Sequence, residues 1–410
     1  MSKYILLVFL GITLSSARAG SPITLDELLS QTAQHHPRRS ALEADIEAAR
    51  AGKRQAFVRP NPELALGAGY KDTDTDSGYA IDAELTFPIE RGGKREARVG
   101  VAESEIRIAE AELMQFLRDN ELQVRTLAYE YITSSADAEI AREIAERSRA
   151  MIDLLKQRPA AGPVILLELR VIEGSLVEFQ QSAREFEAQR DAARSSLNVL
   201  LGRTDNEALN FKDTLSPPSD RYSMDKLSAR LEKSPALLKR LAEIERATHE
   251  SKAAILEAKP DVHVGPYVSR EDAGETETTI GLAVSLPLSW RSRNQGTIAA
   301  AKAHREKAEA DLATEILTAR SDLARRLRLY ESAVAQVEAI PTSLVESLHD
   351  AADLADRQYR LGAIPVQLFL DMQREFLNVQ LMRHNALLES LKIEAELEWL
   401  AGSASGEARL

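Results

Sequence analysis

The chain repeats itself with an offset of about 200 residues, and this duplication constrains its fold more than any other feature. Thr24-Leu-Asp-Glu-Leu28 returns as Ser223-Met-Asp-Lys-Leu227, and Leu85-Thr-Phe-Pro-Ile89 returns as Val284-Ser-Leu-Pro-Leu288. Other landmarks keep the same order and nearly the same offset: Pro37 and Pro235, Pro62 and Pro260, Gly162 and Gly362, Leu200 to Gly202 and Leu400 to Gly402. The sequence predicts one structural plan used twice, with these boundaries: a first repeat at 20–215, a linker at 216–221, a second repeat at 222–402 and a C-terminal tail at 403–410.

Each repeat is predicted to contain a helix, two strands, a very long helix, a tip and a long return helix. Thr24 and Ser223 suit the N-caps of the first helices, and Glu27 makes a capping box of the first. Residues 101–158 contain neither Gly nor Pro, so they predict a helix roughly 87 Å long at about 1.5 Å per residue. Its apolar residues form one narrow stripe on a charged surface, as in a coiled-coil seam. Residues 297–340 repeat this pattern until Pro341, and the predicted fold class is mainly α with a small β part.

The strands are predicted at 62–70, 79–89, 261–270 and 278–288, with polar loops at 71–78 and 271–277. Apolar and polar side chains alternate along them, and each is long enough to cross a bilayer as a tilted strand. A pair of half-buried hairpins in a soluble protein is the alternative. Four strands cannot close a barrel, and open edges in lipid leave backbone groups unpaired. If the strands are transmembrane, three chains sharing 12 strands are the smallest set that leaves a bore.

The first residues have the composition of a secretory signal. Lys3 gives a basic start, an apolar run extends from Tyr4 to Leu14, and small residues at Ala17 and Ala19 predict cleavage after residue 19. The chain contains no cysteine, which excludes disulfides, thiolate metal sites and an acylated cysteine within it. Its formal net charge is −12, and becomes −14 once Lys3 and Arg18 are removed, which argues against nucleic acid as a partner.

We find no pattern that indicates an enzyme, a cofactor or a metal site. No nucleophile elbow, phosphate-binding glycine loop or dinucleotide fingerprint occurs. His35 and His36 are adjacent, and the other five histidines lack the short spacings of a zinc site. Residues 72–76 resemble the start of a calcium loop, but Ser77 and Ala83 stand where such a loop needs Gly and Glu.

The duplicated plan of helices and hairpins resembles the TolC family of outer-membrane efflux proteins over essentially the whole mature chain. Arg59-Pro-Asn-Pro-Glu63 and Phe87-Pro-Ile-Glu-Arg-Gly-Gly-Lys-Arg95 are similar to the cobalt–zinc–cadmium resistance branch of that family. Arg360-Leu-Gly362, followed by Asp371, resembles the family's periplasmic helix tip. The first tip, 156–167, departs from the pattern because Pro159 and Pro163 crowd it.

The resemblance implies a homotrimer in the Gram-negative outer membrane, with a 12-strand barrel in lipid and an α-helical tunnel in the periplasm. It implies a passive, gated conduit that docks on an inner-membrane RND transporter through a periplasmic adaptor. Divalent heavy-metal cations are the substrates that the branch favours, with organic solvents or drugs as the alternative. A soluble periplasmic coiled-coil adaptor or scaffold is the alternative function.

The resemblance also assigns candidate site residues. Arg360, Leu361 and Gly362 correspond to the tip that contacts the adaptor. Asp371 corresponds to the second of two gate aspartates, and Leu368 replaces the first. In the first repeat, Glu168 falls at the position equivalent to Leu368 and would supply the missing carboxylate.

Overall fold

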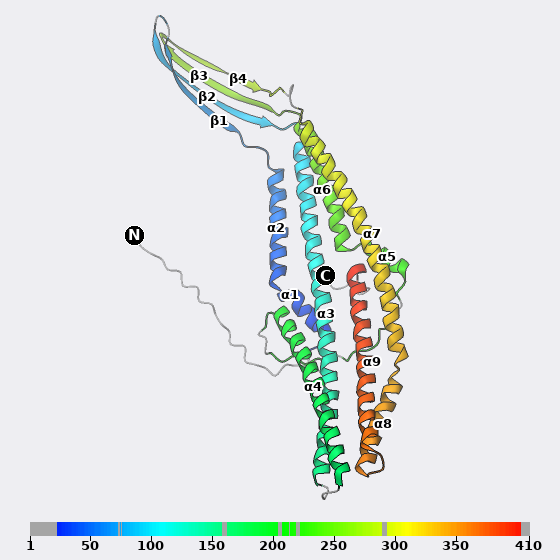
Figure 1. The fold of residues 1–410 in the computed structure, drawn as a ribbon. Helices are drawn as coiled ribbons and strands as arrows, with labels where there is room; N and C mark the ends of the chain where they lie inside the picture. Colours follow the sequence, from blue (N-terminus) through cyan, green and yellow to red (C-terminus); the bar gives the residue numbers. More distant parts are fainter. Residues whose placement is uncertain are drawn as a thin grey trace, which may run out of the picture. The chain divides into compact units, whose positions relative to one another are not determined.

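The computed structural model describes residues 23–72, 74, 76–157, 162–203, 207–212, 214–218, 222–288 and 293–402. The described elements follow one another along the chain as coloured in Figure 1: α1 (Leu25–His35), α2 (Pro37–Phe57), β1 (Glu63–Asp72), β2 (Ser77–Ile89), α3 (Lys94–Gln157), α4 (Gly162–Leu200), α5 (Met224–Leu231), α6 (Pro235–Glu257), β3 (Val262–Ala273), β4 (Glu275–Ser285), α7 (Gln295–Ala339), α8 (Thr342–Arg360) and α9 (Val366–Ala401). The expected fold class, mainly helical with a small β part, is confirmed. The predicted signal peptide and C-terminal tail lie outside the described residues.

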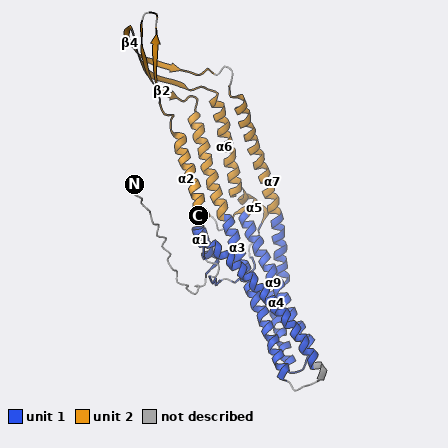
Figure 2. Cartoon of the chain, turned by 60° about the vertical axis from the view of Figure 1, so that its left-hand side comes forward, with its two compact units in different colours: residues 1–36, 118–222, 325–399 blue, residues 37–117, 223–324, 400–410 orange. Residues whose placement is uncertain are grey.

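The chain divides into two compact units, and these units do not coincide with the two repeats (Figure 2). Unit 1 comprises residues 1–36, 118–222 and 325–399, and unit 2 comprises residues 37–117, 223–324 and 400–410. Both repeats therefore contribute to each unit. The helices α3 and α7 begin in unit 2 and continue in unit 1.

Unit 2 contains one antiparallel sheet with the strand order β1-β2-β3-β4. The pairs β1–β2 and β3–β4 are the two predicted hairpins, one from each repeat, and the pairing of β2 with β3 joins the repeats. Leu64 lies opposite Leu85, and Val264 lies opposite both Phe87 and Val284. This register puts the apolar side chains of all four strands on the same face, as the period-two alternation predicts.

The hairpin ends differ from the prediction, because the strands continue through residues expected to form loops. β1 extends to Asp72 and β2 starts at Ser77, while only Gly274, with φ of +93°, separates β3 from β4. An ion pair between Lys71 and Glu271 links the two hairpins there. At its other end β4 stops at Ser285 instead of 288, two residues before Pro287, which has no N–H to donate to a ladder.

A proline divides the first helical segment of each repeat into two helices. α1 starts with a capping box in which Thr24 and Glu27 accept hydrogen bonds from each other's backbone N–H, as predicted. Ser223 stands at the N-cap of α5 without a side-chain hydrogen bond, whereas Ser234 caps α6 by accepting from the backbone N–H of Leu237. Pro37 and Pro235 each start the second helix, where a missing N–H costs nothing.

Glycine and proline residues mark boundaries of the long helices. α3 starts directly after Gly92 and Gly93, whose φ values of +78° and +87° turn the chain from β2 into the helix. α7 ends at Ala339, and Pro341 stands at the N-cap of α8. None of the described helices has an apolar run long enough to cross a membrane.

Unit 1 is a helical bundle with several apolar clusters along it. Near the helix tips, buried side chains from α3, α4, α8 and α9 pack together: Met151, Ile152, Leu155, Ile172, Tyr359, Phe369 and Leu370. Arg374 of α9 donates to Ser175 and Glu178 of α4, and Arg147 of α3 pairs with Asp353 of α8. The two helical hairpins are therefore held together by apolar packing and by ion pairs across them.

Candidate functional site

The second helix tip has the geometry of a Schellman motif. Gly362, with φ of +73°, donates from its N–H to the Tyr359 carbonyl at 2.9 Å, and Ala363 donates to the Gln358 carbonyl at 2.9 Å. These two bonds satisfy carbonyls that the end of α8 leaves without helical partners. The chain can therefore reverse into α9 within a few residues, and the position requires a residue that tolerates positive φ.

The predicted tip residues have different environments. Arg360 donates from Nε and Nη2 to the Asp356 carboxylate, at 2.8 and 3.2 Å, within the last turn of α8. Leu361 is 78% exposed, although it follows Tyr359 of the packed apolar cluster by only two residues. The structure therefore presents an apolar side chain at the extremity of this hairpin. The corresponding first tip includes residues 158–161, which are outside the described part of the chain.

The two candidate gate carboxylates lie on different helices, and each accepts its own hydrogen bond. Glu168 lies in the first part of α4, and its Oε2 accepts from the hydroxyl of Tyr359 at 3.2 Å. Asp371 is exposed on α9, where its Oδ1 accepts from Gln367 at 2.8 Å. No hydrogen bond or ion pair joins the two carboxylates within one chain. Leu368, at the position of the missing aspartate, is 43% exposed.

Sequence reasoning missed a buried polar pair between α3 and α9. The side chain of Asp137 is almost fully buried, and its Oδ1 bonds to Nδ1 of His384, whose other ring nitrogen faces Gln380. The histidine looked isolated because its partner lies 247 residues away in the sequence. In the described residues, however, no group of three or more His, Cys, Asp or Glu side chains could hold a metal ion.

The apolar face of the sheet is open in the single chain. Ile280, Leu282 and Val284 of β4 are 80%, 76% and 68% exposed, and apolar residues of β1 and β2 are similarly exposed. The opposite face carries small and acidic residues, among them Asp82 and Glu84. A continuous exposed apolar surface of this kind marks contact with lipid or protein.

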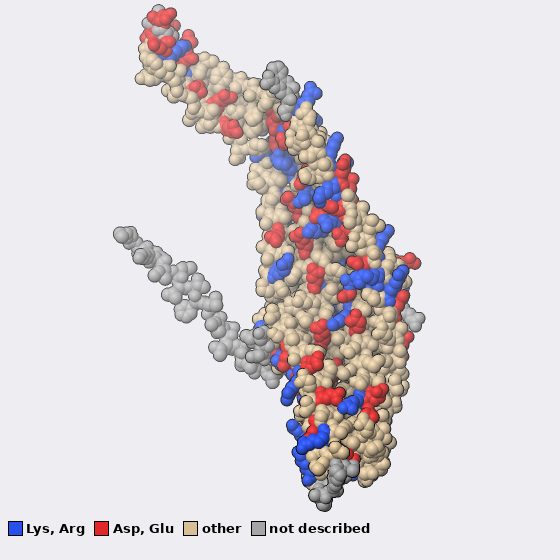
Figure 3. All heavy atoms as spheres, viewed as in Figure 1, with Lys and Arg blue, Asp and Glu red and all other residues tan. Residues whose placement is uncertain are grey.

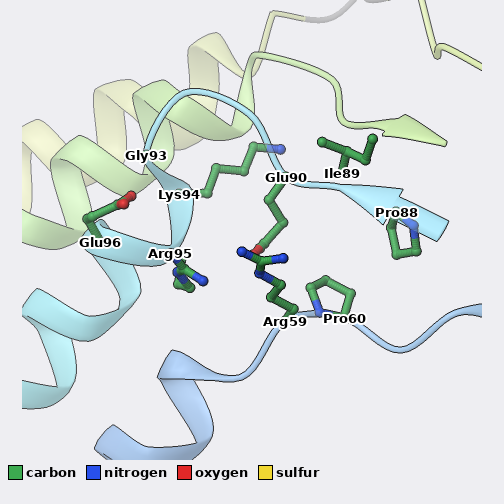
Figure 4. A pocket seen from close by; sticks show the side chains of 9 residues that line it. All are labelled: Arg59, Pro60, Pro88, Ile89, Glu90, Gly93, Lys94, Arg95 and Glu96. Atoms are coloured by element: carbon green, nitrogen blue, oxygen red, sulfur yellow. The ribbon is translucent and has the colours of Figure 1, made fainter. Parts of the chain in front are cut away.

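The two motifs that resemble the metal-resistance branch meet in space at the end of the sheet (Figure 4). Arg59 and Pro60 precede β1, and the segment from Pro88 to Glu96 connects β2 to α3; together they line a pocket in unit 2. Lys94 is buried and pairs with Asp261 at 3.0 Å, while Glu90 lies in the guanidinium fork of Arg98. The fork of hydrogen bonds to Glu90 raises the pKa of Arg98.

Comparison with known proteins gives one family and consistent relatives. The outer membrane efflux protein family matches the chain twice, over residues 28–203 and 227–403. Cobalt-zinc-cadmium resistance protein CzcC of Cupriavidus metallidurans is 24% identical over 389 residues, which are 94% of this chain and 91% of that protein. Nickel-cobalt-cadmium resistance protein NccC of Alcaligenes xylosoxydans xylosoxydans is 29% identical over 334 residues, 76% of this chain and 70% of that protein.

The fold agrees with solved channels. The open state of the MtrE outer membrane channel of Neisseria gonorrhoeae aligns with a TM-score of 0.72 at 14% identity, over 92% of this chain and 89% of that one. The resemblance seen in the sequence is thus confirmed by the family match, by two heavy-metal resistance proteins and by the fold. The chain belongs to the outer membrane efflux protein family: it is an outer-membrane channel subunit for efflux and not an enzyme.

Proposed function

We propose that three copies of this chain form the outer-membrane duct of a tripartite pump that exports divalent heavy-metal cations. Each chain would place its four strands in the bilayer and its long helices in the periplasm. The observation that carries this proposal is the open apolar face of the sheet, with Ile280 80% and Leu282 76% exposed. In a bilayer these side chains would contact acyl chains instead of water.

The strand order supports the oligomer. β1 and β4 are the outer strands of the sheet, so each leaves one edge unpaired within the chain. Unpaired backbone groups in hydrocarbon cost several kcal/mol each. Pairing of β4 of one copy with β1 of the next satisfies both edges, and three copies close a ring of 12 strands around a bore.

The relatives support metal cations as the cargo. CzcC is named for resistance to cobalt, zinc and cadmium, and NccC for resistance to nickel, cobalt and cadmium. A chain with a formal net charge of −12 is compatible with the passage of cations. We infer that the duct receives them from an inner-membrane RND transporter through a periplasmic adaptor that contacts the tip at Leu361.

The test combines assembly with resistance. A strain lacking this chain should lose resistance to zinc, cobalt or cadmium and regain it on complementation, and the protein purified in detergent should be a trimer. Sensitivity to organic solvents or drugs in place of metals would overturn the assigned cargo. Recovery of the protein as a monomer in the soluble periplasmic fraction would overturn the duct itself.

A further inference from the structure

The pocket at the helix end of the sheet is lined by residues of both signs. Cationic side chains come from Arg59, Lys94 and Arg95, and carboxylates come from Glu90 and Glu96. Figure 4 shows Arg59 and Glu90 approaching from opposite walls, with Arg95 on the first turn of α3. The pocket lies where β2 ends, and therefore beside the last residues of the apolar face.

Two arginines remain available in this pocket after the ion pairs are assigned. Lys94 is neutralised by Asp261 and Glu257, at 3.0 and 3.5 Å, and Glu90 is held by Arg98. Arg59 is exposed and Arg95 is half-buried, and neither makes an ion pair with any described residue. Glu96, in the first turn of α3, interacts favourably with the helix dipole. Two arginines against one carboxylate leave the pocket net positive.

Exposed apolar side chains border these arginines. Phe57 and Val58, at the end of α2, are 63% and 51% exposed, and Ile89 at the end of β2 is 51% exposed. The guanidinium carbon of Arg95 lies 5.1 Å from the centroid of the Phe57 ring, in a cation–π contact. A cationic site next to an apolar surface suits an amphiphile, because the charged headgroup can bind the cations while the apolar chains contact the apolar surface.

The charge on the sheet changes sign from one end to the other. The hairpin ends carry carboxylates, which Figure 3 shows gathered at the tip of the sheet: Asp72, Asp74, Asp76, Glu271, Asp272, Glu275 and Glu277. The helix end carries Arg59, Arg91, Arg95 and Arg293. The apolar band of the strands separates the two groups, so the basic end would lie at the periplasmic boundary of the bilayer if the hairpins face outward.

We propose that this pocket binds an anionic glycerophospholipid of the periplasmic leaflet. Arg59 and Arg95 would hold the phosphate, because a guanidinium fork matches phosphate oxygens. The acyl chains would lie along Phe57, Val58 and Ile89 toward the strands. The net positive charge favours an anionic headgroup over a zwitterionic one. This inference rests on the proposed placement of the strands in the bilayer.

The test measures lipid retention by the delipidated full-length protein in detergent. Dioctanoyl phosphatidylglycerol or dioctanoyl phosphatidylcholine is added, and the bound lipid is counted by native mass spectrometry. The parent should retain phosphatidylglycerol in preference. Arg59→Gln with Arg95→Gln should weaken its retention roughly 25-fold, at about fivefold per arginine near anionic lipid. Arg59→Lys with Arg95→Lys keeps both charges but loses the guanidinium forks, so its retention should lie between those of the parent and the double glutamine variant.

A matched control and a competitor make the outcome decisive. Arg320→Gln removes one positive charge, against two in the double variant, from an exposed position on α7, 25 residues beyond the start of that helix and so roughly 37 Å along it. Equal retention by the parent and the double glutamine variant would overturn the proposal, and so would an equal loss in the control. Displacement of the lipid by millimolar inorganic phosphate would show a phosphate-ion site in place of a lipid site. Flotation with phosphatidylcholine vesicles tests separately whether the strands insert into a bilayer. Failure of the proposed duct can therefore be distinguished from failure of the lipid site.

Discussion

The hydroxyl of Tyr359, at the end of α8, donates a 3.2 Å hydrogen bond to the carboxylate of Glu168 on α4. The ring of Tyr359 is only 4% exposed and stacks on Phe369, with centroids 5.4 Å apart and planes inclined by 11°. This bond joins the two helical hairpins of unit 1 beside their tips. A channel that opens by separating its hairpins must break or relocate it.

If this bond helps to hold the tips shut, Tyr359→Phe should loosen them. The variant keeps the stacked ring but leaves the half-buried Glu168 without its donor, which costs about 1.5–3 kcal/mol for a bond to a charged group. The resting conductance in planar bilayers should rise several-fold. Tyr70→Phe, on an exposed tyrosine of the sheet, is the control and should leave the conductance unchanged. An unchanged resting conductance in Tyr359→Phe would mean that the bond has no part in closure.

Glu168→Ala combined with Asp371→Ala should weaken the preference for cations and the block by divalent ions. Three copies of each carboxylate around a threefold axis would raise the local cation concentration. Single-channel reversal potentials in a salt gradient measure the preference directly. Glu375→Ala, an exposed residue one turn further along α9, is the matched control. A double variant that selects like the parent would place the constriction elsewhere.

Leu361→Asp should abolish metal resistance while leaving the trimer and its amount in the outer membrane intact. The residue is 78% exposed, so the substitution disturbs no packing within the chain, but it puts a charge on the apolar tip that we propose docks the adaptor. Leu344→Asp changes a leucine that is 41% exposed on the same helix, roughly 25 Å from the tip, and should keep resistance. Retained resistance in Leu361→Asp would reduce the tip to a simple turn.

Gly362→Ala and Gly174→Ala should change stability in opposite directions. A Cβ would meet no atom within 4 Å at either position, so only the backbone differs. Gly362 has a φ of +73°, where alanine costs roughly 1 kcal/mol or more. Gly174 lies inside α4, where alanine gains up to about 1 kcal/mol. Thermal unfolding in detergent should show a melting temperature below that of the parent for Gly362→Ala and above it for Gly174→Ala.

Glu27→Gln should show a stability defect that disappears in acid. The hydrogen bond with the backbone of Thr24 lowers the pKa of Glu27 below 4.5. A depressed folded-state pKa means that the stabilisation is present above the unfolded pKa and is lost as the pH falls through the folded one. Hydrogen exchange of the α1 amides should be faster in the variant at neutral pH and converge with the parent well below pH 4.5. Lys226→Gln changes the equivalent position of the second repeat, which carries no carboxylate. Its effect on hydrogen exchange should therefore not depend on pH in this range. A defect in Glu27→Gln that is equal at all pH values would contradict the capping role.

The periodic parts of the fold could be predicted, because their signals are local. The alternation along Ile81 to Phe87 predicted the strand β2, the absence of Gly and Pro predicted the long helix α3, and Pro341 predicted the break between α7 and α8. The strand residues at the hairpin ends could not be predicted, because they are rich in acidic residues, which are depleted in strands and so indicate a loop. There the ladder continues through polar cross-strand pairs, such as the one between Glu271 and Glu277.

The candidate site was less predictable, because its contacts join distant residues. Glu168 and Tyr359 are 191 residues apart, and Asp137 and His384 are 247 apart. No spacing rule connects such pairs before the helical hairpins are packed. The pocket behind Arg59 likewise depends on two motifs that meet only after the sheet has formed.

The pairing of β2 with β3 has a consequence for how the oligomer assembles. It joins a hairpin of one repeat to a hairpin of the other, which is the same kind of joint that β4 of one copy must make with β1 of the next. A ring of six hairpins needs six joints, and the duplication makes half of them intramolecular. The tether gives those three a high effective concentration. Ring closure then requires three molecules to meet, whereas chains with a single hairpin would require six. The rate of assembly therefore falls less steeply on dilution than it would for single-hairpin chains.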